Sequence, residues 1–467
     1  KSEDSEYSSA DETSDPIYEN VPSVSRIPKN LYIQKKPPQI LGSKLRSEAH
    51  HAKLATLETE DDPNSYEEAM KRPDKNSWLK AMEEEIASLK KNQVWTLVDR
   101  PEGNVVTNRW VLRIKRKPNG DVDRYKARLV ARGFSQQYGV DYNETYAPVV
   151  DTESIRLLFA YAAIEKLKIA QFDVKTAFLY GSLDEKIYME QPEGFVETEG
   201  KVCLLQRSLY GLKQAPRQWN KKFTDFLVDM KLEMSENDRC VFFRRQPFLI
   251  LAIYVDDGVV FAREQSIAAE LIKQLRTRFE IHSVEPTTYL GFQICRGGGG
   301  EISLHQTSYI NKILKKFNMN ESKPVDNPLT LTKAVGTDKS LGATVPYREA
   351  IGSLLYAATT TRIDIAYAVS RASRDCANPS EASWMAVKRI MRYLNGHQNL
   401  ALTYSRKGNT GLEAYCDADY AGDDSKKSTT GVIILFGGAP IHWRSKLQSI
   451  ITLSSFEAEL DGLCSVT

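Results

Sequence analysis

The feature that most constrains the fold of this chain is an apolar run, residues 248–255, that ends directly in two adjacent acids, Asp256 and Asp257. The run predicts a buried strand, and residues 258–262 predict the second strand of a hairpin. Burying two adjacent carboxylates costs on the order of several kcal/mol each unless a partner neutralises them. A divalent cation would be such a partner, whereas the alternative interpretation is a pair of exposed turn acids.

A third acid has the same setting, because Asp173 lies near the end of a predicted strand at 169–174. If this strand neighbours the one at 248–255, the carboxylates at their ends converge on one place. Such a cluster holds hard cations such as Mg²⁺, which prefer oxygen ligands and leave positions open for phosphate. Two ions roughly 4 Å apart can hold the attacking and leaving oxygens of a phosphoryl displacement. For Asp173 too, an exposed turn acid is the alternative.

Upstream of these acids, residues 109–132 combine a hairpin pattern with a high density of positive charge. Alternation predicts strands at 110–114 and 125–130, joined by a turn at 118–120. The chain as a whole is nearly neutral, with 63 Lys+Arg against 61 Asp+Glu, so this local charge is a distinct feature. It suits phosphate binding, although a solvated hairpin surface is the alternative. The nine cations are Arg109, Arg113, Lys115, Arg116, Lys117, Arg124, Lys126, Arg128 and Arg132.

Length and composition exclude several classes of protein. At roughly 150 residues per domain, 467 residues suggest about three domains, and 41% apolar content can supply their cores. The acidic, serine-rich stretch at 1–65 predicts a disordered tail. No apolar run reaches the roughly 20 residues of a membrane-spanning helix. The six cysteines are far apart and form no CxxC pair, which argues against a disulfide framework or a zinc site and favours reduced thiols inside a cell.

The remaining periodicities predict a mixed α+β chain. An amphipathic helix over 78–89 has Asn76 or Ser77 as its expected N-cap. A final helix is expected to start at Ser454 or Ser455. Further helices are predicted at 154–168, 219–232, 266–279, 347–359 and 380–394, and further strands at 412–416, 431–436 and 441–443.

Three blocks in this order resemble the Pol polyprotein of copia-type LTR retrotransposons: residues 172–179, 209–219 and the sequence Tyr254-Val255-Asp256-Asp257, which is similar to the YxDD motif of reverse transcriptases. The resemblance covers roughly residues 66–463. It implies a multidomain α+β fold, a right-hand polymerase followed by a connection and a truncated RNase H-like α/β domain. The implied boundaries are fingers and palm at 66–280, a thumb-like region at 281–345, a helical connection at 346–405 and the RNase H-like region at 406–467, after the tail at 1–65.

The resemblance also implies roles for single residues. Asp173, Asp256 and Asp257 would be the catalytic, metal-binding acids for two Mg²⁺ ions, with Mn²⁺ as an alternative, and the main-chain carbonyl of Val174 would complete one ion's shell. Phe178 would be the steric gate against a ribose 2′-OH. Gln214 would contact the nucleotide and template strand. Lys126 and Arg128, with Arg116 behind them, would bind the triphosphate, and residues 289–291 would form the primer-grip hairpin.

In the C-terminal region, Asp417 and Glu459 match two of the four metal-binding acids of an RNase H domain. Glu459 could equally be an ordinary acid near a helix start, where the helix dipole favours negative charge. Because the sequence ends at Thr467, before the remaining acids of such a domain, we expect no RNase H activity from this chain.

The resemblance implies an RNA-directed DNA polymerase that adds dNTPs to a primer 3′-OH. Its partners would be an RNA template, a DNA or RNA primer and dNTPs, with no membrane. A homodimer or other Pol segments would be further partners. The implied location is the cytoplasm, including virus-like particles, with nuclear entry as an alternative. The competing hypothesis is a catalytically decayed retroelement fragment that still binds nucleic acid.

Overall fold

The computed structural model describes residues 62–116, 121–329, 345–407, 410–423 and 425–465. The chain divides into two compact units between residues 62 and 63, and every element below belongs to the second unit. Most of the tail predicted at 1–65 and the whole turn predicted at 118–120 lie outside the described residues. Within the described residues, no helix combines the length and apolar character needed to cross a membrane.

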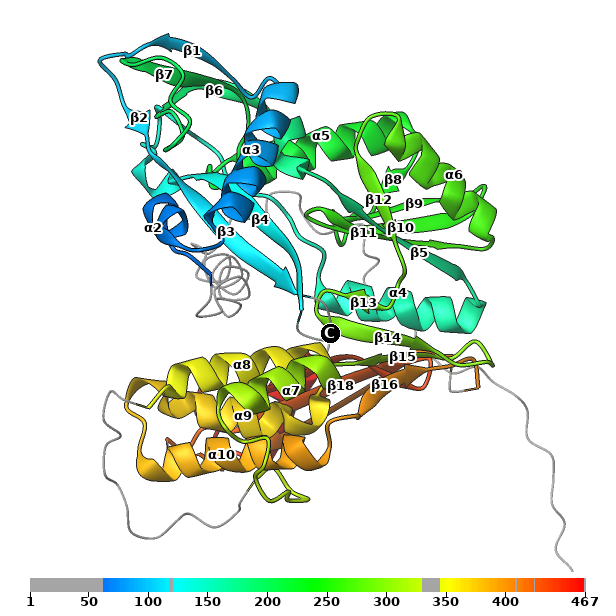
Figure 1. The fold of residues 1–467 in the computed structure, drawn as a ribbon. Coiled ribbons are helices and arrows are strands. Elements are labelled where there is room, and N and C mark those ends of the chain that lie inside the picture. Colours follow the sequence, from blue (N-terminus) through cyan, green and yellow to red (C-terminus); the bar gives the residue numbers. More distant parts are fainter. Residues whose placement is uncertain (1–61, 117–120, 330–344, 408–409, 424, 466–467) are drawn as a thin grey trace, which may run out of the picture. The chain divides into compact units, whose positions relative to one another are not determined.

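The first part of this unit packs a long helix against a hairpin (Figure 1). The predicted amphipathic helix is confirmed, with the Trp78 and Met82 side chains fully buried. Its predicted N-cap is wrong, because the chain reverses at residues 72–74 and the helix already begins at Lys75. The elements are α2 (Tyr66–Lys71), α3 (Lys75–Lys91), the hairpin β3 (Asn108–Arg116) and β4 (Val122–Ala131), and a sheet in the order β1 (Trp95–Asp99), β7 (Lys201–Arg207), β6 (Ser182–Met189) and β2 (Val105–Val106).

A six-stranded sheet forms the centre of the unit. Its order is β12 (Ile281–Val284), β5 (Lys168–Val174), β11 (Asp257–Ala262), β10 (Leu249–Tyr254), β9 (Val241–Arg244) and β8 (Glu233–Met234). Phe159, Phe172 and Phe261 are fully buried in its core. The helices of this core are α4 (Thr152–Glu165), α5 (Ala215–Asp229) and α6 (Gln265–Arg276).

The predicted strands and helices of this central region are confirmed, with one correction. Helix α5 begins at Ala215, four residues before the predicted start at Trp219. The reason is Pro216, which lies in the first turn of the helix. Backbone N–H groups in the first turn have no partner within the helix, so a proline, which lacks the N–H, is tolerated there. The predicted boundary between residues 280 and 281 falls inside the six-stranded sheet, because β12 pairs with β5.

The following segment combines a small sheet with four helices. The sheet order is β13 (Thr288–Tyr289), β14 (Phe292–Arg296), β15 (Ile302–His305) and β16 (Ala401–Tyr404), so strands from 281–345 and 346–405 pair with each other. Helices α7 (Thr307–Lys316), α8 (Tyr347–Thr360), α9 (Ala366–Ser373) and α10 (Glu381–Gly396) share a second core (Figure 1). The helices predicted at 347–359 and 380–394 are therefore confirmed.

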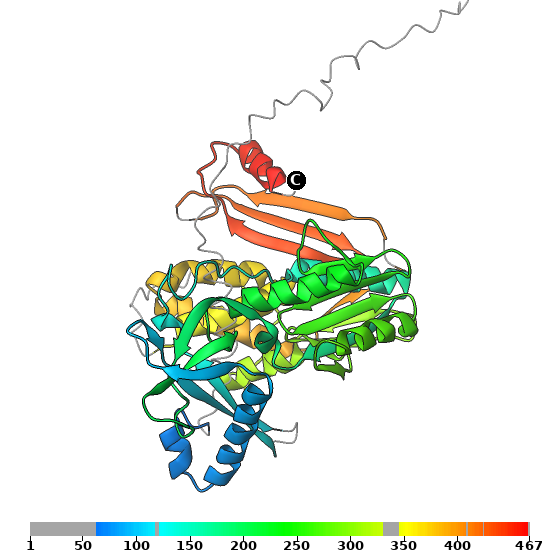
Figure 2. The same ribbon diagram turned by 90° about the horizontal axis from the view of Figure 1, so that it is seen from above.

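The C-terminal part is a three-stranded antiparallel sheet, β17 (Glu413–Asp419), β18 (Thr429–Phe436) and β19 (Ala439–Leu447), with α11 (Ser455–Cys464) beside it (Figure 2). The predicted strands and the helix start are confirmed, and Ser454 caps α11 by accepting from the Glu457 N–H. Strand β19 packs on α4, where the buried Arg156 donates from Nε to the Ile441 carbonyl at 2.6 Å and lies 4.0 Å from the centre of the Trp443 ring. One face of this sheet thus shares the core of the central sheet.

Candidate active site

The acidic ends of two distant strands lie side by side in the central sheet. Strands β5 and β11 are antiparallel neighbours, and Asp173 pairs directly with Asp257. Partners in register project their side chains from the same face of a sheet. The backbone N–H of Val174 also donates to the carbonyl oxygen of Asp256 at 2.9 Å. The predicted convergence of these segments is therefore confirmed, while the catalytic role of the three acids stays a prediction.

The turn that bears Asp256 is held in a strained conformation. Tyr254 pairs with Asp257, which leaves Val255 and Asp256 as a two-residue turn, and Val255 has φ of 57°. A β-branched residue rarely adopts a positive φ, at a cost of about 1–3 kcal/mol. The indole N–H of Trp219 offsets this strain by donating to the Val255 carbonyl at 2.6 Å. Both residues of the turn are therefore fixed through their backbone carbonyls.

The electrostatics of the turn favour binding of a cation. Burial raises the pKa of Asp256, and the neighbouring Asp173 raises it further, whereas Arg128 and Lys126 oppose the shift. Among the described residues, no group of three or more His, Cys, Asp and Glu side chains is arranged to hold a metal ion. Mg²⁺ commonly takes only one or two carboxylates and completes its shell with water and phosphate oxygens. The pair Asp173 and Asp256, with the main-chain carbonyl of Val174 as a further oxygen donor, fits that requirement.

The basic hairpin separates its apolar and charged side chains between two faces. Trp110, Leu112, Ala127 and Leu129 are buried, and the neighbouring Tyr125 ring contacts Trp78 of α3 at 4.8 Å. Cross-strand partners share a face, so the other face carries six cations. These are Arg109, Arg113, Lys115, Arg124, Lys126 and Arg128.

Two cations of this face act on the acids. Lys126 is half-buried, and burial together with Arg128 and other cations lowers its pKa to about 8, although Asp173 opposes this shift. Arg128 acts on the Asp256 carboxyl and also lies 4.7 Å from the centre of the Tyr210 ring. The third predicted phosphate ligand, Arg116, lies nearer the hairpin tip, opposite Val122 and beyond a register shift.

Phe178 lies close to this group of residues. It belongs to a short 3₁₀ helix, η4 (Ala177–Tyr180), which follows Thr176 at φ of 50°. Its half-buried ring contacts Tyr210 edge-on at 4.9 Å, and its carbonyl accepts from the Ser208 hydroxyl. Phe178, Tyr210 and Arg128 are thus linked by ring contacts, and Arg128 in turn interacts electrostatically with Asp256.

Tyr210 is a residue that sequence reasoning missed as a member of the site. The following residue, Gly211, has φ of 92°, and a Cβ there would lie 2.0 Å from the Ala131 carbonyl oxygen. Only glycine permits this close approach, through which the Ala131 N–H donates to the Tyr210 carbonyl at 2.8 Å. The sequence Leu209-Tyr210-Gly211 could have indicated this position, since a glycine directly after an aromatic residue allows another strand to approach the backbone closely.

Gln214 is placed differently from the other predicted residues. Its side chain is fully buried, accepts from Gln136 Nε2 at 3.0 Å and donates to the Asp141 carbonyl at 2.7 Å and to Glu185 Oε2 at 3.1 Å. The structure therefore brings the Gln214 side chain into a buried hydrogen-bond network with Gln136, Asp141 and Glu185. Its predicted contact with nucleotide and template remains untested.

The predicted primer-grip segment forms a hairpin next to Asp257. Tyr289 pairs with Phe292 around a turn at Leu290 and Gly291, both with positive φ. The buried Tyr289 hydroxyl donates to the Asp257 carbonyl at 3.3 Å, and the Tyr356 hydroxyl of α8 donates to the Leu290 carbonyl. The hairpin is thus attached to the acidic turn and to α8, and its contact with a primer remains a prediction.

The two C-terminal acids lie on exposed positions. Asp417 is on β17 and Glu459 is on α11, which packs against β17. They form no metal-binding group with other acids among the described residues. The RNase H-like fold of this region stays a prediction.

Comparisons with known proteins agree on one family. The family model for reverse transcriptase (RNA-dependent DNA polymerase) matches residues 92–331. The chain is 42% identical over 416 residues to the retrovirus-related Pol polyprotein from transposon TNT 1-94 of Nicotiana tabacum, covering 85% of this chain but only 31% of the polyprotein. It is 33% identical over 296 residues to a Ty5-1 transposon protein of Saccharomyces cerevisiae, covering 62% of this chain and 96% of that protein.

Among solved structures, the chain is similar to the foamy viral protease-reverse transcriptase in complex with an RNA/DNA hybrid. The TM-score is 0.43 at 14% identity, and the match covers 84% of this chain and 46% of that chain.

Proposed function

The chain belongs to the reverse transcriptase (RNA-dependent DNA polymerase) family as found in the Pol polyproteins of copia-type retrotransposons, and on this premise we propose that it adds dNTPs to a primer 3′-OH on an RNA template. One observation carries the proposal: the register of β5 and β11 brings Asp173 beside Asp257, and the Val174–Asp256 backbone bond joins Asp256 to the same place. The cations Lys126 and Arg128 are near enough to interact electrostatically with these acids.

In this proposal, Asp173 and Asp256 hold the divalent cations, with Asp257 and the Val174 carbonyl as further oxygen donors. Bound Mg²⁺, or Mn²⁺ in its place, would make the primer hydroxyl more acidic and neutralise charge on the phosphates. Lys126 and Arg128 bind the triphosphate and orient its α-phosphate toward the primer end, and Arg116 extends this positive surface. Electrostatic stabilisation and positioning of this kind supply most of the rate enhancement in phosphoryl transfer.

The remaining residues select and position the nucleotide. The Phe178 ring lies against Tyr210, where it would leave no room for a ribose 2′-OH. Gln214 supports the turn at 211–215 through its buried amide network, so we propose a positioning role for it alongside the predicted contact with the nucleotide.

Primer extension on poly(rA)·oligo(dT) with Mg²⁺ tests the proposal. We expect extension by the native chain and none by Asp256→Asn, which keeps the size of the side chain and removes its charge. Binding of the hybrid should be nearly unchanged, because phosphate contacts come from the basic hairpin. A native chain that binds the hybrid but does not extend the primer would instead support the decayed, non-catalytic fragment.

A further inference from the structure

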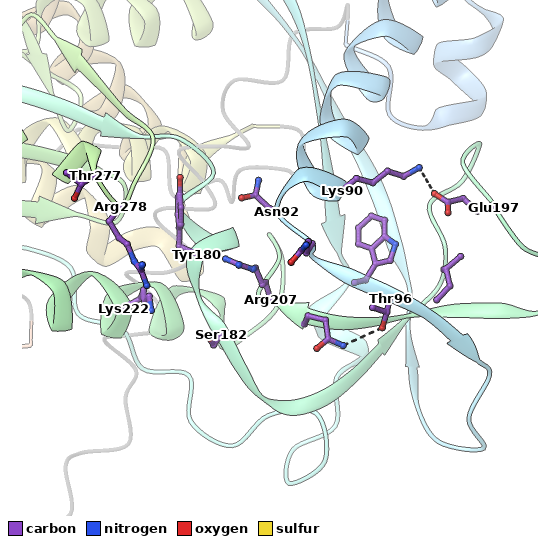
Figure 3. Close-up of a pocket in the computed structure, with 14 residues that line it drawn as sticks. Lys90, Asn92, Thr96, Tyr180, Ser182, Glu197, Arg207, Lys222, Thr277 and Arg278 are labelled. Atoms are coloured by element: carbon purple, nitrogen blue, oxygen red, sulfur yellow. Dashed lines mark hydrogen bonds and ion pairs between the residues drawn. The ribbon is translucent and has the colours of Figure 1, made fainter. Parts of the chain in front are cut away.

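A second charged feature of the chain lies apart from the acids. It is an open cleft of about 1210 Å³ lined by residues of α3 and β1, of η4 and β6, of β7 and α5, and of the segment after α6 (Figure 3). None of Asp173, Asp256, Lys126, Arg128 and Phe178 lines it. Pockets for small ligands usually have volumes of about 300–1,000 Å³, so this cleft has room for a longer molecule.

The walls of the cleft carry an excess of positive charge. Four cations line it, namely Lys90, Arg207, Lys222 and Arg278, against one acid, Glu197. Glu197 is already bound by Lys90 at 2.6 Å. The side chains of Lys222 and Arg278 have no hydrogen-bond or ion-pair partner in the part of the chain that the structure describes. Two of the four cations are therefore available for an anionic ligand.

The cleft also offers aromatic and amide groups. Trp95 and Tyr180 are half-buried, and the Tyr180 hydroxyl accepts from the Glu280 N–H at 2.8 Å, which fixes the ring. The amide side chains of Asn92, Gln93 and Gln206 also line the cleft. A positively charged groove with aromatic rings is the general arrangement that binds single-stranded nucleic acid, because phosphates contact the cations and bases stack on the rings.

The cleft and the contact between Phe178 and Tyr210 share one structural element. Tyr180, which lines the cleft, and Phe178, which contacts Tyr210, are two residues apart on η4. The Arg207 side chain also donates to the Leu179 carbonyl of this element at 3.5 Å. A strand in the cleft would thus contact the 3₁₀ helix that carries Phe178.

We propose that this cleft binds an unpaired segment of a nucleic-acid strand, with Lys222 and Arg278 contacting phosphates and Trp95 and Tyr180 contacting bases. Strand binding itself is independent of catalysis. The identification of this strand as the part of the template not yet copied rests on the proposed function.

The test uses the full chain with Lys222→Glu/Arg278→Glu. The matched control is Lys221→Glu/Lys273→Glu, which makes two charge reversals on α5 and α6 at positions that do not line the cleft. Fluorescence anisotropy measures binding of a 12-nucleotide RNA, of a blunt hybrid and of the same hybrid with a 12-nucleotide template overhang. No nucleotide or Mg²⁺ is added, so the assay is separate from primer extension.

We expect the cleft variant to weaken binding of the RNA and of the overhang hybrid about tenfold and to leave the blunt hybrid unchanged. The slope of log K against log salt should become shallower by about 0.7 for each phosphate that the variant no longer binds. Equal weakening in the control variant, or equal weakening for the blunt hybrid, would overturn the proposal. Displacement of the RNA by micromolar inorganic triphosphate would also overturn it, since the cleft would then bind nucleotide phosphates.

The two proposals fail separately. If Asp256→Asn abolishes extension while the cleft variant binds RNA like the native chain, only the cleft proposal is wrong. If the native chain extends no primer and the cleft variant still binds RNA more weakly, only the proposed polymerase function is wrong.

Discussion

The six-stranded central sheet and the three-stranded C-terminal sheet both carry acids near strand ends, but they hold them differently. In the central sheet, β11 and β5 are interior strands, and Phe172 and Phe261 are fully buried. In the C-terminal sheet, Asp417 lies on the edge strand β17, and nearby Leu453 and Phe456 are 87% and 77% exposed. The acid-bearing strands β5 and β11 are thus held by neighbouring strands on both sides, whereas β17 pairs on one side only among the described residues.

Removing one acid from each region should give the largest contrast. Asp173→Asn should lower the rate of primer extension about 10²–10³-fold, because it removes several kcal/mol of charge stabilisation. Asp417→Asn should change the rate less than about twofold. Initial rates with Mg²⁺ on a hybrid substrate measure both effects. Similar decreases in the two variants would show that the two sheets do not differ in this respect.

Core truncations should show a similar contrast in stability. Phe261→Ala, at a fully buried position, should lower the free energy of unfolding by about 3–5 kcal/mol. Phe456→Ala, at an exposed position, should change it by less than about 0.5 kcal/mol. Urea unfolding followed by tryptophan fluorescence gives both values. A large effect of Phe456→Ala would show that the C-terminal helix is packed more firmly than its exposure indicates.

Phe178→Ala in the central region should change the selection between dNTPs and rNTPs, whereas Phe456→Ala in the C-terminal region should not. The space opened beside Tyr210 should admit a ribose 2′-OH, and the preference for dNTPs over rNTPs should fall about 10–100-fold. Ratios of kcat/KM for matched nucleotide pairs measure the preference, and Phe456→Ala serves as the aromatic control. Unchanged discrimination in Phe178→Ala would exclude this ring as the gate.

The smallest expected effect concerns pH. Burial and neighbouring cations lower the pKa of Lys126 to about 8, so its ammonium group loses its proton as pH rises through 8. Below that pH the charged form binds phosphate, so kcat/KM for dNTP should decline above it by a few-fold. Lys126→Arg keeps its charge, and the ratio of native to variant activity removes other pH effects. A ratio that stays constant from pH 7 to 9.5 would contradict this role.

Local patterns in the sequence predicted much of the central region. The apolar run before Asp256 predicted β10, and the hairpin with β11 followed from the short turn. That β5 and β11 are neighbours was assumed and not predicted. Their residues are about 85 positions apart in the sequence, and local sequence patterns carry no information on pairing at that distance. The starts of α3 and α5 were missed because a chain reversal and a proline shift a helix boundary without changing its periodicity.

The candidate site was predicted less completely than the strands that carry it. The convergence of Asp173 and Asp256 could be predicted because each acid comes at the end of an apolar strand, while their catalytic role stays a prediction. The expected contact of Gln214 with substrate stays a prediction, and its hydrogen bonds to Gln136 and Asp141 could not be predicted because those residues are distant in sequence and show no pattern of their own. Tyr210 was missed for a similar reason, since its position depends on the close approach of Gly211 to β4.

The backbone bonds to the carbonyls of Val255 and Asp256 have a consequence for repeated reaction cycles. An indole and a neighbouring strand hold this turn through backbone atoms, independently of any ligand. The entropy lost in ordering the backbone that carries Asp256 is thus spent once, during folding, and not at each step of the proposed reaction. A polymerase that must repeat the same step along a whole template would gain from this at every position.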